Sequence, residues 1–230
     1  MAGILYAIPT PLGGKAADAL PASALNTVRT LRYFVVENAK SARAFLKEAA
    51  MPCAIQELHI SVLEVDVSKH VEKLQDGISI GLLSEAGCPA IADPGASLVE
   101  AAQQAGIRVV PLIGPSSLIL ALMASSLEGQ RFAFCGYLPR EAEQRKQKIG
   151  ALESRSRRER ETQIFIETPH RNDAMFAALL ETCAPGTRLC VASDLTLTSE
   201  DVKTKPVAGW RAAGHAIGKR PTVFLLLAMN

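Results

Sequence analysis

The 230-residue sequence lacks the marks of a metal site, a disulfide framework and a membrane span. Its five cysteines are scattered, with no CxxC pair, and its four histidines show no HxH or HxxxH spacing. No apolar run approaches the roughly 20 residues that cross a bilayer, and the start MAGILYAIPTP has no cationic segment of a secretory signal. These absences predict a cytoplasmic protein that holds no metal and does not enter a membrane.

An excess of charge of one sign is also missing, because the net charge is only +2. The overall charge therefore gives no reason to expect a polyanionic partner. Basic residues are nonetheless concentrated between residues 144 and 160, interleaved with glutamates at helical spacing. A solvated helix face is one interpretation of this segment, and an RNA-binding face is the other. The cations concerned are Arg145, Lys146, Lys148, Arg155, Arg157, Arg158 and Arg160.

Short apolar runs in the first half alternate with helix-like stretches. Such alternation predicts a parallel sheet covered by helices on both faces, since parallel strands need crossover helices. The expected strands cover residues 3–9, 33–37, 78–84 and 108–113, with a weaker one at 53–58. The expected helices lie within residues 19–31, 40–50, 67–77 and 95–106.

The second half predicts a different sheet. A turn-rich segment with no long helix precedes the last run, so that strand is expected to pair antiparallel in a mixed sheet. The predicted strands cover residues 131–139, 162–169, 188–195 and 222–228, with helices at 140–155 and 171–184. The fold class is therefore α/β, with domains at 1–113 and 114–230, a new helix starting at Ser116 and a ligand cleft between the domains.

Elaborate loops follow several expected strands, where open α/β sheets bind ligands. IPTPLGG at 8–14 lacks the GK[ST] ending of a phosphate loop, and its prolines remove amide donors, so it is either a rigid turn or a ligand wall. In SEAGCPAIADPG at 84–95, Gly87 and Gly95 allow positive φ and close approach of backbone to a ligand. The alternative is a structural crossover in which Asp93 caps the next helix.

Two further motifs have a structural and a functional interpretation. GPSS at 114–117 offers helix-start amides and hydroxyls, or only a cap by Ser116. ETPHR brings Glu167, His170 and Arg171 to one strand end. A lone histidine near a turn is more often structural than catalytic, and no serine or cysteine can be paired with it from sequence.

The order of these motifs resembles the tetrapyrrole methylase superfamily, within it most closely the branch with the bacterial 16S ribosomal RNA ribose 2'-O-methyltransferase. The resemblance rests on LYAIPTPLGG, the block from LLSEAGCPAIADPG through GPSS, FAFCGYLPR, IFIETPHRN and GKRPTVFLLLA, from about residue 3 to residue 228. It implies two α/β domains, S-adenosyl-L-methionine in the cleft between them, S-adenosyl-L-homocysteine as product, and a homodimer. By position, the implied cofactor residues are Pro9, Ser84, Glu85, Ala86, Gly87, Cys88, Ile91, Pro115, Ser116 and Ser117.

The resemblance implies methyl transfer to an oxygen or nitrogen acceptor, with RNA as a candidate substrate. Glu37, Lys40 and Glu85 are the candidate catalytic residues, because a base helps to unmask the acceptor. The relatives resemble AEDTRHT where this chain has VENAKSA at 36–42. That departure motivates an alternative, a paralogue that binds cofactor or RNA without catalysis. A corrin- or porphyrin-ring methylase is the third option.

Overall fold

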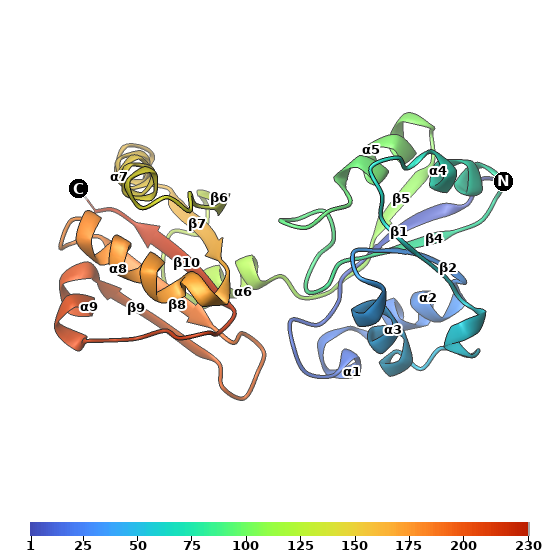
Figure 1. The fold of residues 1–230 in the computed structure, drawn as a ribbon, viewed down its shortest axis with the longest axis horizontal. Helices are drawn as coiled ribbons and strands as arrows, with labels where there is room; N and C mark the ends of the chain where they lie inside the picture. Colours follow the sequence, from blue (N-terminus) through green and yellow to red (C-terminus); the bar gives the residue numbers. More distant parts are fainter. Residues whose placement is uncertain (230) are drawn as a thin grey trace. The chain divides into compact units, whose positions relative to one another are not determined.

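The computed structural model describes residues 1–229, and they divide into two compact units, Met1–Ser116 and a second unit that starts at Ser117 (Figure 1). The domain boundary predicted from the sequence lies three residues earlier, between residues 113 and 114. Each unit has its own sheet and its own buried core. No helix within residues 1–229 has both the length and the apolar character of a membrane span.

The first unit contains the expected parallel sheet, with strand order β3-β2-β4-β1-β5. Leu5 of the middle strand β1 pairs with Ile80 on one side and Val109 on the other. Every residue of β4 is buried, as expected for a central strand covered on both faces. The strands are β1 (Ile4–Ile8), β2 (Tyr33–Val36), β3 (His59–Val62), β4 (Ile80–Leu83) and β5 (Arg108–Pro111).

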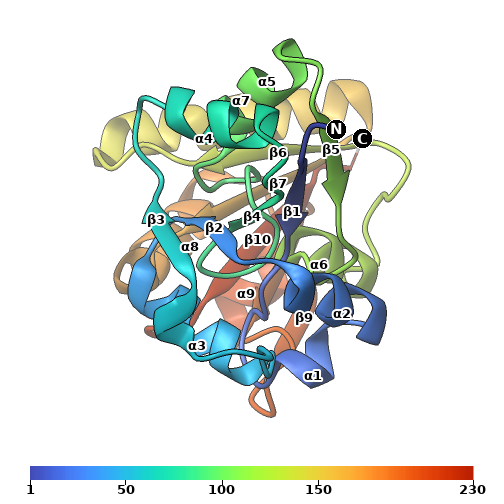
Figure 2. The ribbon, with the colours of Figure 1, turned by 90° about the vertical axis from the view of Figure 1, so that its right-hand side faces the viewer.

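Helices cover both faces of this sheet, so the unit has three layers (Figure 2). One face packs its apolar side chains against α1, α2 and α3, and the opposite face packs against α4 and α5. The helices are α1 (Ala16–Ala19), α2 (Ala22–Thr30), α3 (Ala39–Glu48), α4 (Ser68–Gln75) and α5 (Ala96–Gln104). All four predicted helical stretches of this half are therefore confirmed.

The weak strand predicted at 53–58 is wrong. Residues Ile55–Glu57 form the short 3-10 helix η1, and strand β3 begins after it, at His59. As the edge strand of the sheet, β3 has no buried residue, so it can be built from His59 and Ser61 without an apolar run. The apolar residues of 53–58 serve instead to anchor the turn, where Leu58 is buried against the α1–α3 side.

The second unit contains a mixed sheet with strand order β6-β7-β10-β8-β9. The last strand, β10, runs antiparallel to both β7 and β8, which confirms the expected reversal. The sequence analysis missed β9, a polar edge strand with the sequence DVKTKP. The strands are β6 (Phe132–Tyr137), β7 (Thr162–Glu167), β8 (Arg188–Ser193), β9 (Asp201–Pro206) and β10 (Thr222–Leu227).

One face of the mixed sheet packs against α7, α8 and α9 around the buried side chains of Phe165, Phe224 and Trp210. Helix α6 contacts β10 separately. Helix α9 was not predicted either; the turn-rich segment expected before β10 follows this helix. The helices are α6 (Ser117–Ala124), α7 (Ala142–Glu159), α8 (Asn172–Thr182) and α9 (Val207–Ala213), with the 3-10 turn η2 (Pro169–Arg171) before α8.

Candidate active site

Three of the loops expected to bind a cofactor are joined to one another in the first unit. Thr10, after β1, forms an isolated antiparallel bridge with Gly87, after β4, through two backbone hydrogen bonds of 2.9 and 3.0 Å. The Cys88 thiol lies 3.4 Å from the Pro115 carbonyl oxygen and donates to it, which attaches the loop after β5. All three loops follow the carboxyl ends of their strands, so the junction lies at the edge where parallel sheets bind their ligands.

Small residues make this junction close-packed. Gly87 has φ +77°, and a Cβ atom added there would lie 3.3 Å from the Leu12 side chain. A Cβ on Gly114 would lie only 2.4 Å from the Cβ of Pro9. The buried Ser84 hydroxyl donates to the Gly87 carbonyl over 2.9 Å and fixes the turn between them. Glycine at these positions is thus a requirement of the geometry.

The loop from residue 84 to 95 carries more backbone strain than its glycines predict. Gly87 and Gly95 adopt positive φ as expected, but Ala90 and Ala92 do so as well, at 63° and 65°. Alanine in this region costs on the order of 1–2 kcal/mol per residue. Such strain is concentrated in active sites and ligand clamps, where the surrounding structure enforces it.

Two of the candidate catalytic residues meet beside this loop. Glu37 follows β2, Glu85 follows β4, and the amide of Glu85 donates to the Glu37 carboxylate over 3.2 Å. The Ser41 hydroxyl lies 3.3 Å from the Glu85 carboxylate and donates to it from the first turn of α3. The neighbouring strands β2 and β4 end at the same edge, so the two acids are brought together by the sheet itself.

A third carboxylate, Asp93, belongs to this group and was not predicted as a site residue. Burial raises the pKa of Asp93 to about 6, and the negative charges of Glu37 and Glu85 add to the rise. Asp93 also lines a cavity of about 450 Å³, together with Glu64 and the start of α5. A carboxyl group with a pKa near neutrality can hold or accept a proton under physiological conditions.

The alternative role of Asp93 as a helix cap is wrong. Helix α5 begins at Ala96, its N-cap position is Gly95, and no side chain caps it. The Asp-Pro pattern that suggested the cap instead places Asp93 in the strained loop. The one sequence signal for Asp93 as a candidate site residue was the presence of several acids in and around a single loop.

Lys40, the third candidate catalytic residue, is exposed on the first turn of α3. Its backbone amide donates to the Asn38 side chain over 2.8 Å, and the Ser41 amide donates to the same oxygen. Asn38 is therefore the N-cap of α3. Within residues 1–229 no ion pair involves the Lys40 side chain.

The other candidate cofactor residues lie on the three joined loops with different degrees of exposure. Pro9, Ser84 and Gly87 are buried, and Cys88, Pro115, Ser116 and Ser117 are half-buried. Ala86 and Ile91 are exposed, with 49% of the Ile91 surface accessible. The first group builds the walls of the junction, while the exposed residues are available to contact a ligand.

In the second unit, the ETPHR segment forms an internal ion pair. Arg171 donates to the buried Glu167 carboxylate, whose other oxygen accepts the Thr168 amide over 2.6 Å. His170 is exposed. These contacts favour the structural interpretation of the motif, because both carboxylate oxygens of Glu167 already accept hydrogen bonds from Arg171 and Thr168.

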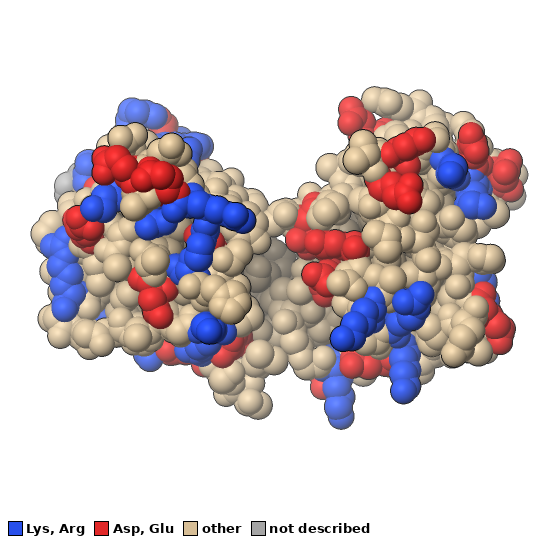
Figure 3. Space-filling view, viewed as in Figure 1, with Lys and Arg blue, Asp and Glu red and all other residues tan. Residues whose placement is uncertain are grey.

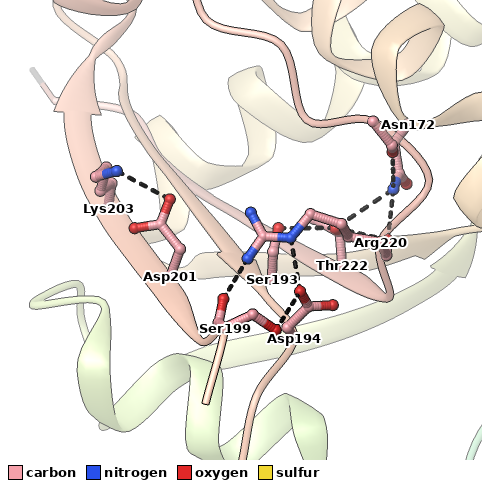
Figure 4. Close-up of polar contacts among 9 residues, drawn as sticks. Asn172, Ser193, Asp194, Ser199, Asp201, Lys203, Arg220 and Thr222 are labelled. Carbon is pink, nitrogen blue, oxygen red and sulfur yellow. Dashed lines mark hydrogen bonds and ion pairs between the residues drawn. The ribbon is translucent and has the colours of Figure 1, made fainter. Parts of the chain in front are cut away.

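A polar network at the same edge of the second sheet links the loop after β8 to the start of β10 (Figure 4). Asp194 accepts the Arg220 guanidinium at 2.7 Å and the Ser199 hydroxyl at 2.9 Å. Burial alone would raise the pKa of Asp194, but the Arg220 and Ser199 hydrogen bonds outweigh it and lower the pKa. Asn172 secures the other side by donating to the Arg220 carbonyl over 2.7 Å. Together these contacts hold the loop in place.

Residues 1–229 show no side-chain arrangement for a metal site, and the two buried cysteines are not suited to act as nucleophiles. No group of three or more histidine, cysteine or acidic side chains is arranged to hold a metal ion there. All five cysteines are free. Burial raises the pKa of Cys183 to about 12 and that of Cys190 to about 11, so neither is a thiolate nucleophile at neutral pH.

Comparisons with known proteins agree with the geometry. A sequence model of the family described as Tetrapyrrole (Corrin/Porphyrin) Methylases matches residues 5–209. The chain is 35% identical over 207 residues to the Ribosomal RNA small subunit methyltransferase I of Vibrio cholerae serotype O1, covering 90% of this chain and 70% of that protein. It is 31% identical over 211 residues to the protein of that name from Bacillus subtilis, with the same coverage.

Solved structures share the fold at low sequence identity. The crystal structure of a diphthine synthase superposes with a TM-score of 0.67 at 15% identity, covering 98% of this chain and 89% of the other. A uroporphyrin-III-C-methyltransferase from Thermus thermophilus gives a TM-score of 0.55 at 17% identity, with 99% and 93% coverage.

Proposed function

The chain belongs to the tetrapyrrole methylase family and is a methyltransferase; on that premise we propose that it transfers the methyl group of S-adenosyl-L-methionine to RNA. The observation that carries the proposal is the junction of the loops after β1, β4 and β5 beside the carboxylates of Glu37, Glu85 and Asp93. We expect the cofactor to bind in a cleft to which this junction contributes one wall.

The residues of the junction fit this cofactor. Adenosylmethionine carries no phosphate, so loops in which prolines replace amide donors are suitable for it. It carries a sulfonium cation, which neighbouring carboxylates complement electrostatically. Ala86 is exposed and has a small side chain, so a ligand can approach the backbone there. When bound, the cofactor supplies an activated methyl group, so the protein has mainly to align the acceptor.

The carboxylates supply the remaining chemistry. An acceptor hydroxyl loses a proton as its oxygen bonds to the methyl carbon and the bond from that carbon to sulfur breaks. Asp93, whose pKa is about 6, is ionised in most molecules at pH 7 and can accept the proton. Burial, with a smaller contribution from the charges of Glu37 and Glu85, keeps that pKa high, which makes Asp93 a stronger base than an isolated aspartate.

RNA is proposed as the acceptor because the relatives in Vibrio cholerae and Bacillus subtilis are named as methyltransferases of small-subunit ribosomal RNA. The altered segment at 36–42 motivated the alternative that this chain is a paralogue without catalytic activity. Asn38 in that segment caps α3, and Glu37 still meets Glu85 there. The change therefore leaves a carboxylate group that can act as a base.

Two measurements test this proposal. Calorimetry should detect micromolar binding of adenosylmethionine and adenosylhomocysteine to the purified protein. Incubation with labelled adenosylmethionine and ribosomal RNA from a strain lacking the gene should label the small-subunit RNA at one position, located by mass spectrometry. The absence of cofactor binding at high micromolar ligand contradicts the proposal, and label in a tetrapyrrole fraction alone would assign a different acceptor.

We also propose a cytoplasmic homodimer, as the family resemblance implies. Five free cysteines without a disulfide are consistent with a reducing compartment. Sedimentation equilibrium should give twice the chain mass of 24.5 kDa. A single species at the monomer mass at micromolar protein would contradict the dimer, and fractionation of the producing cells tests the compartment.

A further inference from the structure

Three cations lie on one face of α3, the helix that starts beside the carboxylates. Lys40, Arg43 and Lys47 are spaced by three and four residues, so they form a single line on the helix surface. At 1.5 Å per residue this line is about 10 Å long. We name it the α3 ridge; all three of its side chains are exposed.

The α3 ridge differs from the other basic helix of the chain in how its charges are used. Of the seven cations noted in the sequence on α7 and at its C-cap, four form ion pairs with glutamates. The pairs are Lys146 with Glu181, Arg155 with Glu161, Arg157 with Glu153, and Arg158 with Glu159. Within residues 1–229, Arg145, Lys148 and Arg160 form none. Among the described residues, no carboxylate pairs with Lys40, Arg43 or Lys47.

These pairings favour a solvated face for α7 and leave α3 with charge to offer a partner. Each of the four paired cations lies beside a carboxylate that would repel a polyanion, whereas the ridge cations lie in no such pair within the described part of the chain. Figure 3 shows Lys and Arg side chains gathered over α3 and α1 in the first unit. The acid of α3, Glu48, points its carboxylate to the Ala16 amide of α1, 3.3 Å away.

The ridge extends from the first turn of α3, beside the proposed catalytic carboxylates, to a groove. In the first turn of α3, Ser41 donates to Glu85. Farther along, Arg43 and Lys47 line a groove of about 530 Å³ whose apolar lining includes Met51 and Ile55. A groove of this volume is in the range of small-ligand sites. Cations beside an apolar surface suit a nucleotide, which has a phosphate and a base.

We propose that the α3 ridge binds the phosphate backbone of the RNA acceptor and leads it to the carboxylates. The inference rests on the proposed function, since it assumes an RNA substrate. Each phosphate neutralised by a cation releases counterions, so the contribution of the ridge must appear in the salt dependence of binding.

The test compares two double variants that lose the same charge. Arg43→Gln/Lys47→Gln removes two ridge cations, and Arg155→Gln/Arg158→Gln removes two cations of α7. Glutamine is a good helix former, so both exposed helices should persist. Binding of a small-subunit ribosomal RNA transcript and of a 20-nucleotide poly(U) is measured by filter binding between 50 and 300 mM salt.

The ridge variant should bind RNA about 10- to 30-fold more weakly at 0.1 M salt, with a log–log salt slope shallower by about 1.4. The α7 variant should stay within about threefold of the unchanged protein. Cofactor affinity, measured by calorimetry, should be unaltered in both.

Four outcomes would overturn the inference. Equal losses in the two variants would mean that only net charge matters, and a loss confined to the α7 variant would assign the RNA surface to that helix. Failure of the unchanged protein to bind either RNA would exclude the ridge as an RNA surface. Methylation of RNA by the unchanged protein tests the proposed function separately. If that methylation occurs and the ridge variant binds RNA as tightly as the unchanged protein, the inference about the ridge is contradicted and the proposed function is not.

Discussion

At the scale of single residues, Asp93 controls the expected dependence of activity on pH. If it accepts the acceptor proton, kcat/KM should rise as pH increases through about 6, where the carboxyl group ionises. Asp93→Asn should lower kcat/KM by about 100- to 10,000-fold, the range of a general base, and remove that limb of the profile. Labelled methyl transfer to RNA between pH 5 and 9 measures both effects.

Glu64→Gln is the matched control, because Glu64 lines the same cavity as Asp93 and the substitution removes the same charge. Its pH profile should keep the acid limb of the unchanged protein. An Asp93→Asn variant that retains the limb would mean that another group accepts the proton.

The raised pKa of Asp93 also predicts an effect on stability. An unfolded aspartate has a pKa of about 3.9, so between pH 4 and 6 the folded protein binds more protons and loses stability as pH rises. Asp93→Asn removes this loss. At pH 8 the variant should have a free energy of unfolding about 1 kcal/mol higher, a value discounted for solvent screening of a half-buried group. Urea titrations should show no difference at pH 3; a difference there of the same size would contradict this linkage.

Asn38, in the segment that departs from the family resemblance, has a structural role. It caps α3 by accepting the amides of Lys40 and Ser41. Asn38→Ala should lower the free energy of unfolding by about 1 kcal/mol, the usual contribution of an N-cap, whereas Asn38→Asp should retain most of it. Urea denaturation followed by circular dichroism compares the two. Equal losses would mean that the carbonyl oxygen of the cap does not carry the effect.

The candidate site was only partly predictable from its residues. Glu37 and Glu85 came from the family resemblance, and the pairing of β2 with β4 explains why they meet. Asp93 was missed because Asp-Pro before a helix is equally typical of a cap. Ala90 and Ala92 carry no sequence signal for positive φ, since that conformation is enforced by the surrounding loop.

At the scale of secondary structure, the buried strands were predictable, but two of the four edge strands were not. β1, β2 and β4 are apolar runs because helices cover both of their faces. β3 and β9 are edge strands, so their sequences HISV and DVKTKP need no apolar periodicity. Helix α9 is only seven residues long and contains Gly209, and its buried anchors Val207 and Trp210 became evident only in the packed unit.

The joined loops are the element whose disruption should affect the cofactor. Gly87→Ala forces an alanine to φ +77° and places its Cβ 3.3 Å from the Leu12 side chain. We expect a loss of about 2 kcal/mol in the free energy of unfolding, with cofactor affinity at least 10-fold weaker. Thermal unfolding and calorimetry with adenosylmethionine measure the two effects.

Gly106→Ala is the control for the loop, because Gly106 has φ +69° with no atom within 4 Å of an added Cβ. It should lose about 1 kcal/mol through backbone strain alone and keep normal cofactor affinity. If Gly87→Ala binds the cofactor as tightly as Gly106→Ala, the junction is not part of the cofactor site.

At the scale of the whole molecule, each of the three core clusters draws its members from one unit. The single tryptophan, Trp210, is 1% exposed in the core of the second unit, so its fluorescence reports the unfolding of that unit. Leu46→Ala opens a cavity in the first unit and should cost about 2–5 kcal/mol there. We expect its circular dichroism transition in urea to start at lower concentration while the fluorescence midpoint stays in place.

Leu179→Ala provides the reciprocal variant, because Leu179 is fully buried in the same core cluster as Trp210. It should shift the fluorescence midpoint by the amount that its cavity predicts. Two units with separate cores then behave as two cooperative transitions, and a single free energy of unfolding does not describe the chain. Coincident fluorescence and circular dichroism midpoints in both variants would show instead that the units unfold as one. In that case a substitution in either core would also weaken a cofactor site built from the loops of the first unit.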